Sequence, residues 1–582
     1  MTAGRQVEFV AVNRHQGKKN RVENISPRSF FWTGLALVAS AMVLGAWVSW
    51  RRWPDLLVDF GGQLYIPWRL AHGAVLYRDV YYFAGGPFSQ YFNALLFKLF
   101  GTSFFTLIVA NLTWVAITVC LLYRRFVAAA DVLTATIIGL GIVLVFAFGQ
   151  YTSIGNYNYL APYSHEMLHG LVLSILGVML LSDWLAREKI RFAFAAGFCS
   201  GIVFLTKPDI FVALALASLV AFAIFFLTRR RIDFAAKSLV AFSVAGLAPA
   251  FGFFLYFCRV ETWRESLRAV LFGWLPLLQS GVARNPYYQW CLGFDLPFPH
   301  LQAMAGHFIF VASAVTIYAV AFRFLPKLKS EPVRWVAAFL LLAPLLWSVF
   351  SLILLLKLGL FARIWHYGFA LAMPAFVTSV YLLLWLLPGL LAEKFQVPSR
   401  FFRAAVGLVL VIGFGSLFLQ SKKFYNAKDL AVGRAGDRIM ALGPSGNSVE
   451  ARTTLAALAW IETNVPPDAT IAALPQGVML NYLSRRINPT PCLDWNPTQF
   501  AVFSQDKMTA AFEKTPPDYV LLVQWNAYDF GVGGEFGHYP GYGVELMWWI
   551  GTNYAPAALF GSEPLKNGLF GIKILRRTLP SP

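Results

Sequence analysis

The chain has 582 residues, of which 58% are hydrophobic and only 13% are charged, and its formal net charge is +19. A soluble protein of this length carries nearly twice that density of charge, so the composition predicts a polytopic membrane protein. The excess of Lys and Arg lies in short segments between apolar runs, where basic residues set membrane topology. We therefore expect membrane lipids as partners and no nucleic acid.

A polar, basic tail at residues 1–29 precedes the first apolar run, which has the length of a signal anchor and no cleavage site behind it. A membrane-spanning helix needs about 20 apolar residues, and this criterion predicts about eleven spans in a membrane domain at residues 30–420. The predicted spans are 30–50, 103–123, 131–149, 165–184, 192–206, 209–228, 236–257, 302–323, 334–356, 364–387 and 404–420. The fifth span is short and meets the sixth at Lys207-Pro208-Asp209, which predicts a tight hairpin.

The basic connectors fall on one side of the predicted bundle, together with the N-terminal tail. They contain Arg124 and Arg125; Arg187, Lys189 and Arg191; Arg229, Arg230 and Arg231; Lys327, Lys329 and Arg334; and Lys394, Arg400 and Arg403. The positive-inside rule puts this side in the cytoplasm of a multi-pass protein of the inner or plasma membrane. The loops 53–87, 150–164, 259–301 and 357–363 and the C-terminal part then face outward.

The first outer loop, residues 53–87, is too polar to span a bilayer and too apolar for a solvated linker. Asp55, Asp59 and Asp79 lie among Trp, Tyr and Phe, with Arg78 close by. Carboxylates in aromatic surroundings at a membrane face are costly, which indicates a function. The stretches 62–72 and 88–100 are amphipathic and too short to span, so we expect two helices along the interface.

The C-terminal part, residues 421–582, alternates shorter helical and strand patterns. We expect helices at 454–464, 477–486, 504–514 and 544–554, and strands at 469–474, 518–524 and 571–575. This order predicts a small extracytoplasmic α/β domain with a partly parallel sheet.

Three groups can then converge on one outer cavity: Asp59 after the first span, Glu166 at the entrance of the fourth, and the Lys207 hairpin. With Val58-Asp59-Phe60 in the first loop, two interfacial helices and His165-Glu166 opening the fourth span, the chain resembles the GT-C superfamily of polyprenyl-phosphate-sugar glycosyltransferases. Within it the likeness is to the protein O-mannosyltransferase and lipid A aminoarabinose transferase type. The mannosyltransferases carry paired acids in the first loop, whereas here Phe60 follows Asp59.

The resemblance implies inverting transfer of a sugar from a polyprenyl phosphate to a hydroxyl of a lipid, glycan or protein. Asp59 is the expected catalytic base. The alternative for Asp59 is an N-cap of the helix at 62–72. The leaving phosphate needs cationic partners, and the candidate substrate-binding residues in and around the cavity are Arg78, Asp79, His165, His169, Lys207, Arg363 and His366. For Arg78 and Lys207, pairing with lipid head groups is an equal alternative, and Arg363 and His366 are equally well explained as a structural pair.

The segment His165-Glu166-Met167-Leu168-His169 also matches the HExxH pattern. On a helix its two imidazoles share a face and could bind zinc, which makes an intramembrane zinc metalloprotease the main alternative function. The spans lack the Asp-Gly motif that such proteases share, so we interpret Glu166 as a second catalytic acid, and His165 and His169 as contacts to phosphate, acceptor or a divalent metal ion. A purely structural role, in which these polar groups cap the helix and pack at its start, is the other alternative.

The connector at 150–164 is rich in side chains that stack on sugars or hydrogen-bond to them. These are Tyr151, Asn156, Tyr157, Asn158, Tyr159 and Tyr163. An interfacial aromatic belt explains the same residues equally well. A transporter or flippase remains a third class of function, although transporters usually show repeat symmetry and broken helices near mid-membrane.

Overall fold

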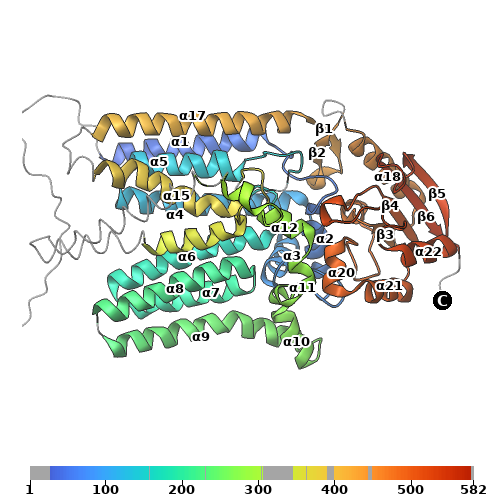
Figure 1. Ribbon diagram of the computed structural model, residues 1–582, viewed down its shortest axis with the longest axis horizontal. Coiled ribbons are helices and arrows are strands. Elements are labelled where there is room, and N and C mark those ends of the chain that lie inside the picture. The colour runs from blue at the N-terminus through green and yellow to red at the C-terminus, as the bar shows by residue number, and fades with distance from the viewer. Residues whose placement is uncertain are drawn as a thin grey trace, which may run out of the picture.

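The computed structural model describes residues 27–155, 157–229, 231–302, 305, 345–361, 363–389, 399–443 and 448–578. Figure 1 shows a bundle of long helices and, at the end of its long axis where the C-terminus lies, a part that contains a β-sheet. The short helices α2 (Phe60–Ala71), α3 (Phe88–Phe100) and α12 (Pro286–Leu292) lie where the two parts meet. This junction is where the predicted outer loops come together.

Seven helices of the described residues are long and apolar enough to cross a membrane. They are Phe30–Val48 in α1 (Pro27–Val48), α4 (Phe104–Ala129), α6 (His165–Arg187), α8 (Pro208–Arg229), α9 (Ile232–Phe257), Phe369–Gly389, and Arg400–Asn426 in α17 (Ser399–Asn426). Helix α6 is the inner one, since 78% of its most apolar window is buried against 11% for α9. Large apolar side chains such as Val43, Leu219 and Leu247 stay exposed on the outer helices, as contact with lipid tails allows. The chain is a multi-pass membrane protein.

Three shorter apolar helices complete the described bundle: Val132–Ala147, Ile190–Phe204 (α7) and Leu345–Leu358. The first is α5 (Val132–Gly141) continued by the π-helical segment η1 (Ile142–Ala147). The span Phe369–Gly389 consists of η5 (Phe369–Ala372), α15 (Met373–Tyr381) and η6 (Leu382–Leu386) with the residues that follow. Nine predicted spans therefore correspond to helices, and the described part of span 334–356, from residue 345, is also helical. The predicted span 302–323 and the basic tail lie almost wholly outside the described residues.

Ion pairs link basic residues of three connectors in the described part of the chain near one end of the bundle. Arg125 donates to Asp183 at 2.9 Å, and Arg231 donates to Glu188, beyond the end of α6, at 2.6 Å. Arg403 pairs with Asp131 at the start of α5. The common end is as predicted, and its cytoplasmic location remains a prediction.

The hairpin between α7 and α8 has the predicted position, because α7 ends at Phe204 and α8 begins at Pro208. It packs against the glycines that close the first outer loop. The Gly86 N–H donates to the Thr206 carbonyl at 2.7 Å, and a Cβ on Gly86 would lie 2.4 Å from the Leu205 carbonyl oxygen. Only glycine fits at this approach of two backbones. The first loop is thus attached to the hairpin that carries Lys207.

The outer segment after α9 folds into short helices rather than crossing the membrane. They are α10 (Trp263–Val270), η2 (Phe272–Leu278), α11 (Ser280–Ala283) and α12, and η4 (Leu356–Leu358) lies against them later in the chain. Thr262 and Glu265 form a capping box that fixes the start of α10. Helix α12 places Tyr287 and Tyr288 at the junction.

The C-terminal part contains two sheets. The strands β1 (Lys428–Val432) and β2 (Ile439–Leu442), joined through η7 (Ala435–Asp437), form an antiparallel pair. The second sheet has the order β3-β4-β6-β5, in which only β3 and β4 are parallel. Its strands are β3 (Ile471–Leu474), β4 (Tyr519–Val523), β5 (Tyr554–Gly561) and β6 (Gly571–Arg577). The predicted partly parallel sheet is confirmed, and β1, β2 and β5 are strands that the sequence did not reveal.

Alternation of side chains along the strands builds a hydrophobic core on each face of this sheet. Ala473, Leu521 and Ile574 pack on the side of α18 (Glu450–Asn464), and Leu474, Val520 and Leu522 pack on the opposite side. The helices of that opposite side are α20 (Pro497–Phe503), α21 (Gln505–Lys514) and α22 (Val544–Asn553), and η9 (Tyr528–Phe530) follows β4. Burial on both faces explains why β3 and β4 are almost wholly apolar.

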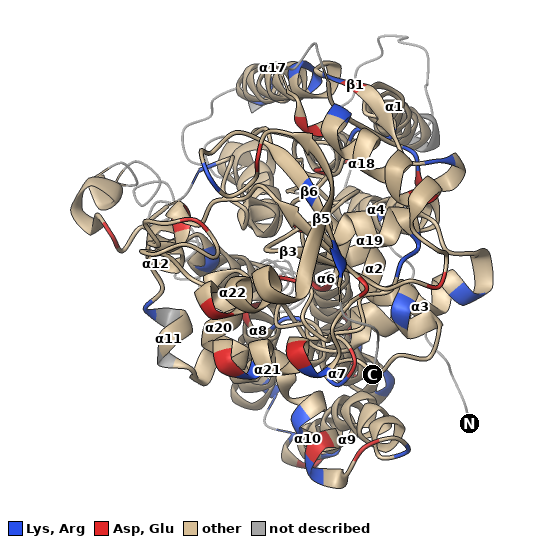
Figure 2. Cartoon of the chain, turned by 90° about the vertical axis from the view of Figure 1, so that its right-hand side faces the viewer, with Lys and Arg blue, Asp and Glu red and all other residues tan. Residues whose placement is uncertain are grey.

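The C-terminal part packs directly on the first outer loop through α19 (Val478–Ser484). A Cβ on Gly61 of α2 would lie 2.6 Å from the Met479 backbone nitrogen, so the two helices approach closely. Viewed from this end, basic and acidic residues are interspersed rather than segregated (Figure 2).

Candidate functional site

Asp59 lies immediately before α2, where the helical bundle meets the C-terminal part. The residue is exposed, and its backbone has φ 56° and ψ −54°, a strained conformation for a residue with a side chain. It occupies the N-cap position, but its side chain makes no capping hydrogen bond to α2. The alternative of a capping aspartate is therefore not realised. Strain of this kind is often retained at functional sites.

The electrostatic neighbours of Asp59 come from three other parts of the chain. Burial first, and then the charge of Asp59, raises the pKa of Tyr157 in the 150–164 connector. The Asp59 charge also contributes to the raised pKa of Tyr163 and of Tyr287 in α12, behind burial in both cases. The carboxyl of Asp494, from the C-terminal part, has its pKa raised to about 7 by burial and then by Asp59. These residues define the candidate site.

Two lysines lie close to tyrosines of this site. The buried Lys207 Nζ donates to the Tyr163 hydroxyl at 2.7 Å, and burial lowers the pKa of Lys207. Lys357 forms an ion pair with Asp209 at 3.1 Å and lies 5.6 Å from the centre of the Tyr367 ring. Sequence reasoning found Lys207 and missed Lys357, whose ion-pair partner Asp209 is 148 positions away in the chain (357 − 209).

Glu166 lies behind the site, in a buried hydrogen-bond network. Its carboxylate accepts from the Tyr82 hydroxyl and the Ser164 hydroxyl, each at 2.7 Å, and from the Gln90 amide at 2.9 Å. Burial raises the pKa of Tyr163, and the charges of Asp59 and Glu166 add to that rise. The network joins the start of α6 to the first outer loop and to α3.

The two histidines of the HExxH pattern lie in different surroundings. Gln63 Oε1 lies 2.8 Å from His165 Nδ1 and also accepts from the His165 backbone N–H, and the Asn111 amide lies 3.1 Å from His165 Nε2. Since the amide oxygen can only accept, His165 donates from Nδ1 and accepts at Nε2. His169 is buried against Phe92, and neither of its ring nitrogens has a hydrogen-bond partner.

These residues do not fit a metal site. Both His165 nitrogens are engaged, and the Glu166 oxygens accept from other groups. Among the described residues, no group of three or more His, Cys, Asp or Glu could hold a metal ion. The hydrogen bonds of His165 and Glu166 therefore do not favour the zinc protease.

Arg78 and Asp79 form an ion pair with each other. Arg78 donates to both Asp79 carboxylate oxygens at 2.8 Å and lies 3.4 Å from Glu261 beyond α9. The hydrogen bonds from Arg78 lower the pKa of Asp79. The pair thus ties the first outer loop to the end of α9.

Arg363 and His366, both predicted to bind substrate, differ in their exposure and in their hydrogen bonds. Arg363 is exposed and lies over the rings of Phe361 and Trp365. His366 accepts from the Gly368 N–H at Nδ1, at 2.9 Å, and its Nε2 donates to the Cys291 carbonyl at 2.7 Å. Burial lowers the pKa of His366 to about 4. The imidazole is therefore neutral and engaged, so the two residues do not grip one anion together.

The tyrosines and asparagines of the 150–164 connector divide into two groups. Tyr159 donates to the Ala370 carbonyl at 2.6 Å, Tyr151 to the Val145 carbonyl at 2.9 Å, and Asn158 holds its own loop. Tyr157 and Tyr163 lie edge to face with centroids 6.2 Å apart, beside Asp59. The first group is structural and the second faces the site, while Asn156 lies outside the described residues.

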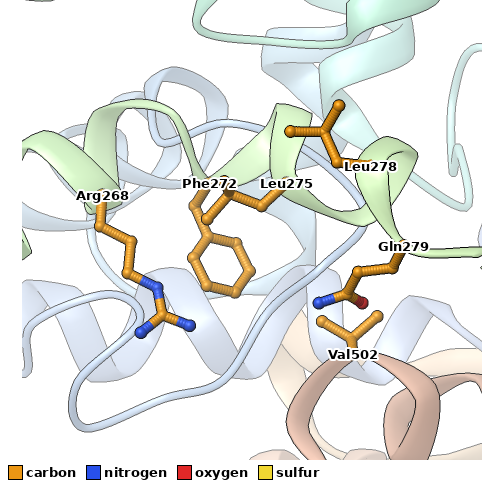
Figure 3. A pocket seen from close by; sticks show the side chains of 6 residues that line it. All are labelled: Arg268, Phe272, Leu275, Leu278, Gln279 and Val502. Carbon is orange, nitrogen blue, oxygen red and sulfur yellow. The ribbon is translucent and has the colours of Figure 1, made fainter.

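A pocket lies at one edge of the junction, between η2 and α20 (Figure 3). Its lining is apolar apart from Arg268 and Gln279: Phe272, Leu275, Leu278 and Val502. Phe272 belongs to a stack of rings that continues to Tyr77 on one side, at 4.3 Å, and to Phe503 of α20 on the other, at 5.7 Å. The stack fastens α20 to the outer loops.

The sequence matches no known protein-family profile and no curated protein. The fold is similar to that of ArnT from Cupriavidus metallidurans bound to undecaprenyl phosphate, with a TM-score of 0.50 and 15% identity over 93% of this chain and 98% of that one. The Archaeoglobus fulgidus oligosaccharyltransferase in complex with Zn and sulfate gives a TM-score of 0.48 and 14% identity over 85% of this chain and 68% of that one. The likeness shows that the chain shares the overall fold of ArnT, in line with the architecture expected from the sequence.

Proposed function

We propose that this protein is a membrane glycosyltransferase that moves a sugar from a polyprenyl-phosphate donor to an acceptor hydroxyl, with Asp59 as the general base. The observation that carries the proposal is the setting of Asp59. It is an exposed, strained aspartate, unused as a helix cap, among tyrosines at the mouth of a GT-C bundle. The similar ArnT structure was bound to undecaprenyl phosphate, which supports a lipid-phosphate donor.

The base role follows from the chemistry of the acceptor. A hydroxyl is a poor nucleophile, and a carboxylate within hydrogen-bond reach removes its proton as the new bond forms. The acceptor oxygen forms a bond to the sugar C1 while the bond from C1 to the phosphate oxygen breaks. The proton goes to Asp59 and the bonding electron pair leaves with the lipid phosphate. Attack opposite the leaving group inverts the configuration at C1.

Lys207 and Lys357 are the proposed partners of the leaving phosphate. Both lie at the outer ends of membrane helices, and both are linked to tyrosines of the site. Fixed cations in a poorly hydrated cavity stabilise developing negative charge more strongly than solvated ones. Arg363 is exposed on the same outer segment and is a further candidate for contact with phosphate.

We propose a positioning role for the Glu166 network. Glu166 accepts hydrogen bonds from the first outer loop at Tyr82 and from α3 at Gln90, and Gln63 of α2 bonds to His165 beside it. These contacts hold α2 against α6. Because Asp59 immediately precedes α2, the network fixes the place of the base.

The site faces the side opposite the basic connectors. By the positive-inside rule this is the extracytoplasmic side, where the acceptor hydroxyl of a lipid, glycan or protein would enter. The tyrosines Tyr157, Tyr163 and Tyr287 offer faces on which a sugar ring can stack and hydroxyls that can hydrogen-bond to it.

The test uses the purified full chain in lipid nanodiscs with a panel of polyprenyl-phosphate sugars. Transfer is followed by release of the polyprenyl phosphate, and the anomeric configuration of the product is compared with that of the donor. We expect inversion, and a fall of about 10²- to 10⁴-fold in kcat for Asp59→Asn. The proposal fails if the wild-type chain transfers no sugar from any donor.

Asp55→Asn is the matched control in the same loop. Asp55 Oδ1 accepts from the backbone N–H groups of Leu57 and Val58, each at 2.9 Å, and an Asn oxygen can accept both. We expect this variant to keep wild-type turnover. Equal turnover of Asp59→Asn and wild type would remove Asp59 as the base, and a retained anomer would exclude direct inversion.

A further inference from the structure

We propose that the pocket between η2 and α20 binds an anionic glycerophospholipid whose head group carries a hydroxyl, the chemistry of phosphatidylglycerol. Arg268 binds the phosphate, Gln279 accepts a hydrogen bond from the head group, and the apolar lining contacts the first part of an acyl chain. The site does not depend on the sugar transfer proposed above, and its test needs no sugar donor.

The pocket lies at the level of the bilayer surface. Helix α9 is a candidate membrane span that ends at Phe257, and α10 begins shortly after it, at Trp263. Trp263 and Leu267 are exposed one helical turn apart, and so are their neighbours Arg264 and Arg268. Trp, Leu and Arg side by side on a short helix are typical of the boundary between acyl chains and head groups. The pocket that begins at Arg268 therefore opens where phospholipid head groups lie.

The size and the lining of the pocket suit part of an amphiphile. Its volume is about 320 Å³, at the lower end of the range of small-molecule sites. Phe272 and Leu275 of η2 and Val502 of α20 form apolar walls, and Leu278 continues them outward with 82% of its surface exposed. An acyl chain that covers Leu278 removes apolar surface from water, which favours binding.

Arg268 is a cation that forms no hydrogen bond or ion pair with the described residues. The two acids closest to it in the chain are engaged elsewhere. Glu265 accepts from the Thr262 backbone N–H at 3.2 Å and from its hydroxyl at 2.8 Å, and Glu261 lies 3.4 Å from Arg78. A guanidinium presents a planar fork of N–H donors that matches the oxygens of a phosphate. The charge at this end of the pocket is therefore available to an anionic head group.

Gln279 provides an unsatisfied acceptor at the other end of the pocket. Its Oε1 is buried and has no hydrogen-bond partner. Figure 3 shows the Gln279 amide and the Arg268 guanidinium at the two ends of the pocket, with the Phe272 ring between them. A buried acceptor without a partner is costly, so a ligand that brings a hydroxyl donor is favoured over one that does not. Phosphatidylglycerol carries this hydroxyl beside its phosphate, whereas the head group of phosphatidic acid is the phosphate alone.

The experiment measures which phospholipids the purified full chain retains. The chain is reconstituted in nanodiscs of phosphatidylcholine, phosphatidylglycerol and phosphatidic acid in equal amounts with identical acyl chains, extracted into mild detergent and analysed by native mass spectrometry. We expect retention of phosphatidylglycerol to exceed that of phosphatidylcholine by about fivefold, the effect of one basic side chain at a lipid surface. It should also exceed that of phosphatidic acid. Equal retention of the three lipids overturns the inference.

Arg268→Gln and Arg264→Gln form a matched pair. Each removes one exposed guanidinium from α10, but only Arg268 lines the pocket, whereas Arg264 lies over the Trp263 ring at 5.3 Å. We expect Arg268→Gln to retain phosphatidylglycerol no better than phosphatidylcholine, and Arg264→Gln to behave as wild type. An equal loss in both variants means general attraction by surface charge and overturns the inference.

Two further variants keep the inference falsifiable. Gln279→Leu has a side chain of similar size without the acceptor, so it should retain phosphatidylglycerol and phosphatidic acid equally. A preference for phosphatidylglycerol over phosphatidic acid that persists in this variant contradicts the role of Gln279. If Arg268→Gln does not fold, Arg268→Glu reverses the charge and should retain less phosphatidylglycerol than phosphatidylcholine. Unchanged retention in Arg268→Glu overturns the inference.

A polyprenyl phosphate is the other source of a phosphate with an apolar chain. Undecaprenyl phosphate is therefore added to the extracted wild-type chain, and we expect it to leave the bound phosphatidylglycerol in place. Displacement at an equimolar amount means that the pocket binds the polyprenyl phosphate and that the phospholipid assignment is wrong. If phosphatidylglycerol is retained through Arg268 but no sugar is transferred, the proposed function fails while this inference stands. Sugar transfer without retention through Arg268 removes this inference alone.

Discussion

Adjacent glycines in α2 allow a matched test of how the C-terminal part is seated beside Asp59. A Cβ on Gly61 would lie 2.6 Å from the backbone nitrogen and 2.9 Å from the Cα of Met479 in α19, whereas a Cβ on Gly62 meets nothing within 4 Å. Gly61→Ala and Gly62→Ala therefore make the same chemical change in the same helical turn. Only the first places an atom in the interface.

The size of the effect follows from these contacts. To reach an ordinary contact of 3.4 Å, α19 must move by about 0.8 Å, and rotating the Met479 side chain gives no relief because the obstacle is backbone. Overpacking of this kind costs about 1–3 kcal/mol. The gain in helix propensity from Gly to Ala, at most about 1 kcal/mol, is shared by both variants and cancels between them.

The assay is the free energy of unfolding of the two variants in identical mixed micelles. We expect Gly62→Ala to be as stable as wild type or more so, and Gly61→Ala to be less stable than Gly62→Ala by about 1–3 kcal/mol. Adding Met479→Ala should not rescue Gly61→Ala. Equal stability of the two alanine variants would refute the close seating of α19 on α2.

Two further predictions concern buried charged groups. Glu166→Gln should cost about 1–3 kcal/mol of unfolding free energy, because an amide in place of the carboxylate leaves at least one of the three buried donors unsatisfied. The control is Glu188→Gln, beyond the other end of α6. This variant should lose no more than about 1 kcal/mol of unfolding free energy, because it removes only surface ion pairs. If Glu166→Gln instead keeps its stability and loses turnover, Glu166 has a role in the chemistry. Lys428 donates to the backbone carbonyls of Arg52 and Pro54, and burial lowers its pKa from 10.5 to about 8. Between these two values the unfolded chain binds the proton that the folded chain has released, so stability should rise with pH across this window, and Lys428→Met should flatten the rise in unfolding titrations.

The sequence alone was enough to predict the membrane bundle and the α/β nature of the C-terminal part. Both follow from local patterns: apolar runs of about 20 residues for spans, and apolar strands between helical stretches for the sheet. Asp59 and Lys207 could be chosen as candidates from the sequence, because each has an ionisable side chain at a predicted membrane boundary, where placing a charge is costly. The GT-C likeness rests on the order of these same features.

The roles of individual polar residues were decided by the tertiary structure. Whether Glu166 is open to a substrate or enclosed depends on Tyr82 and Gln90, which reach it from other elements. His366 looks like an anion ligand in the sequence, yet two backbone groups engage its ring. The sequence around Lys357 does not indicate that Asp209 is its ion-pair partner. The sequence around Asp494 likewise does not indicate that the charge of Asp59 affects its pKa. A helical or strand pattern reports on contacts a few residues away, whereas the charge and accessibility of a buried group are set by residues that only the folded chain brings together.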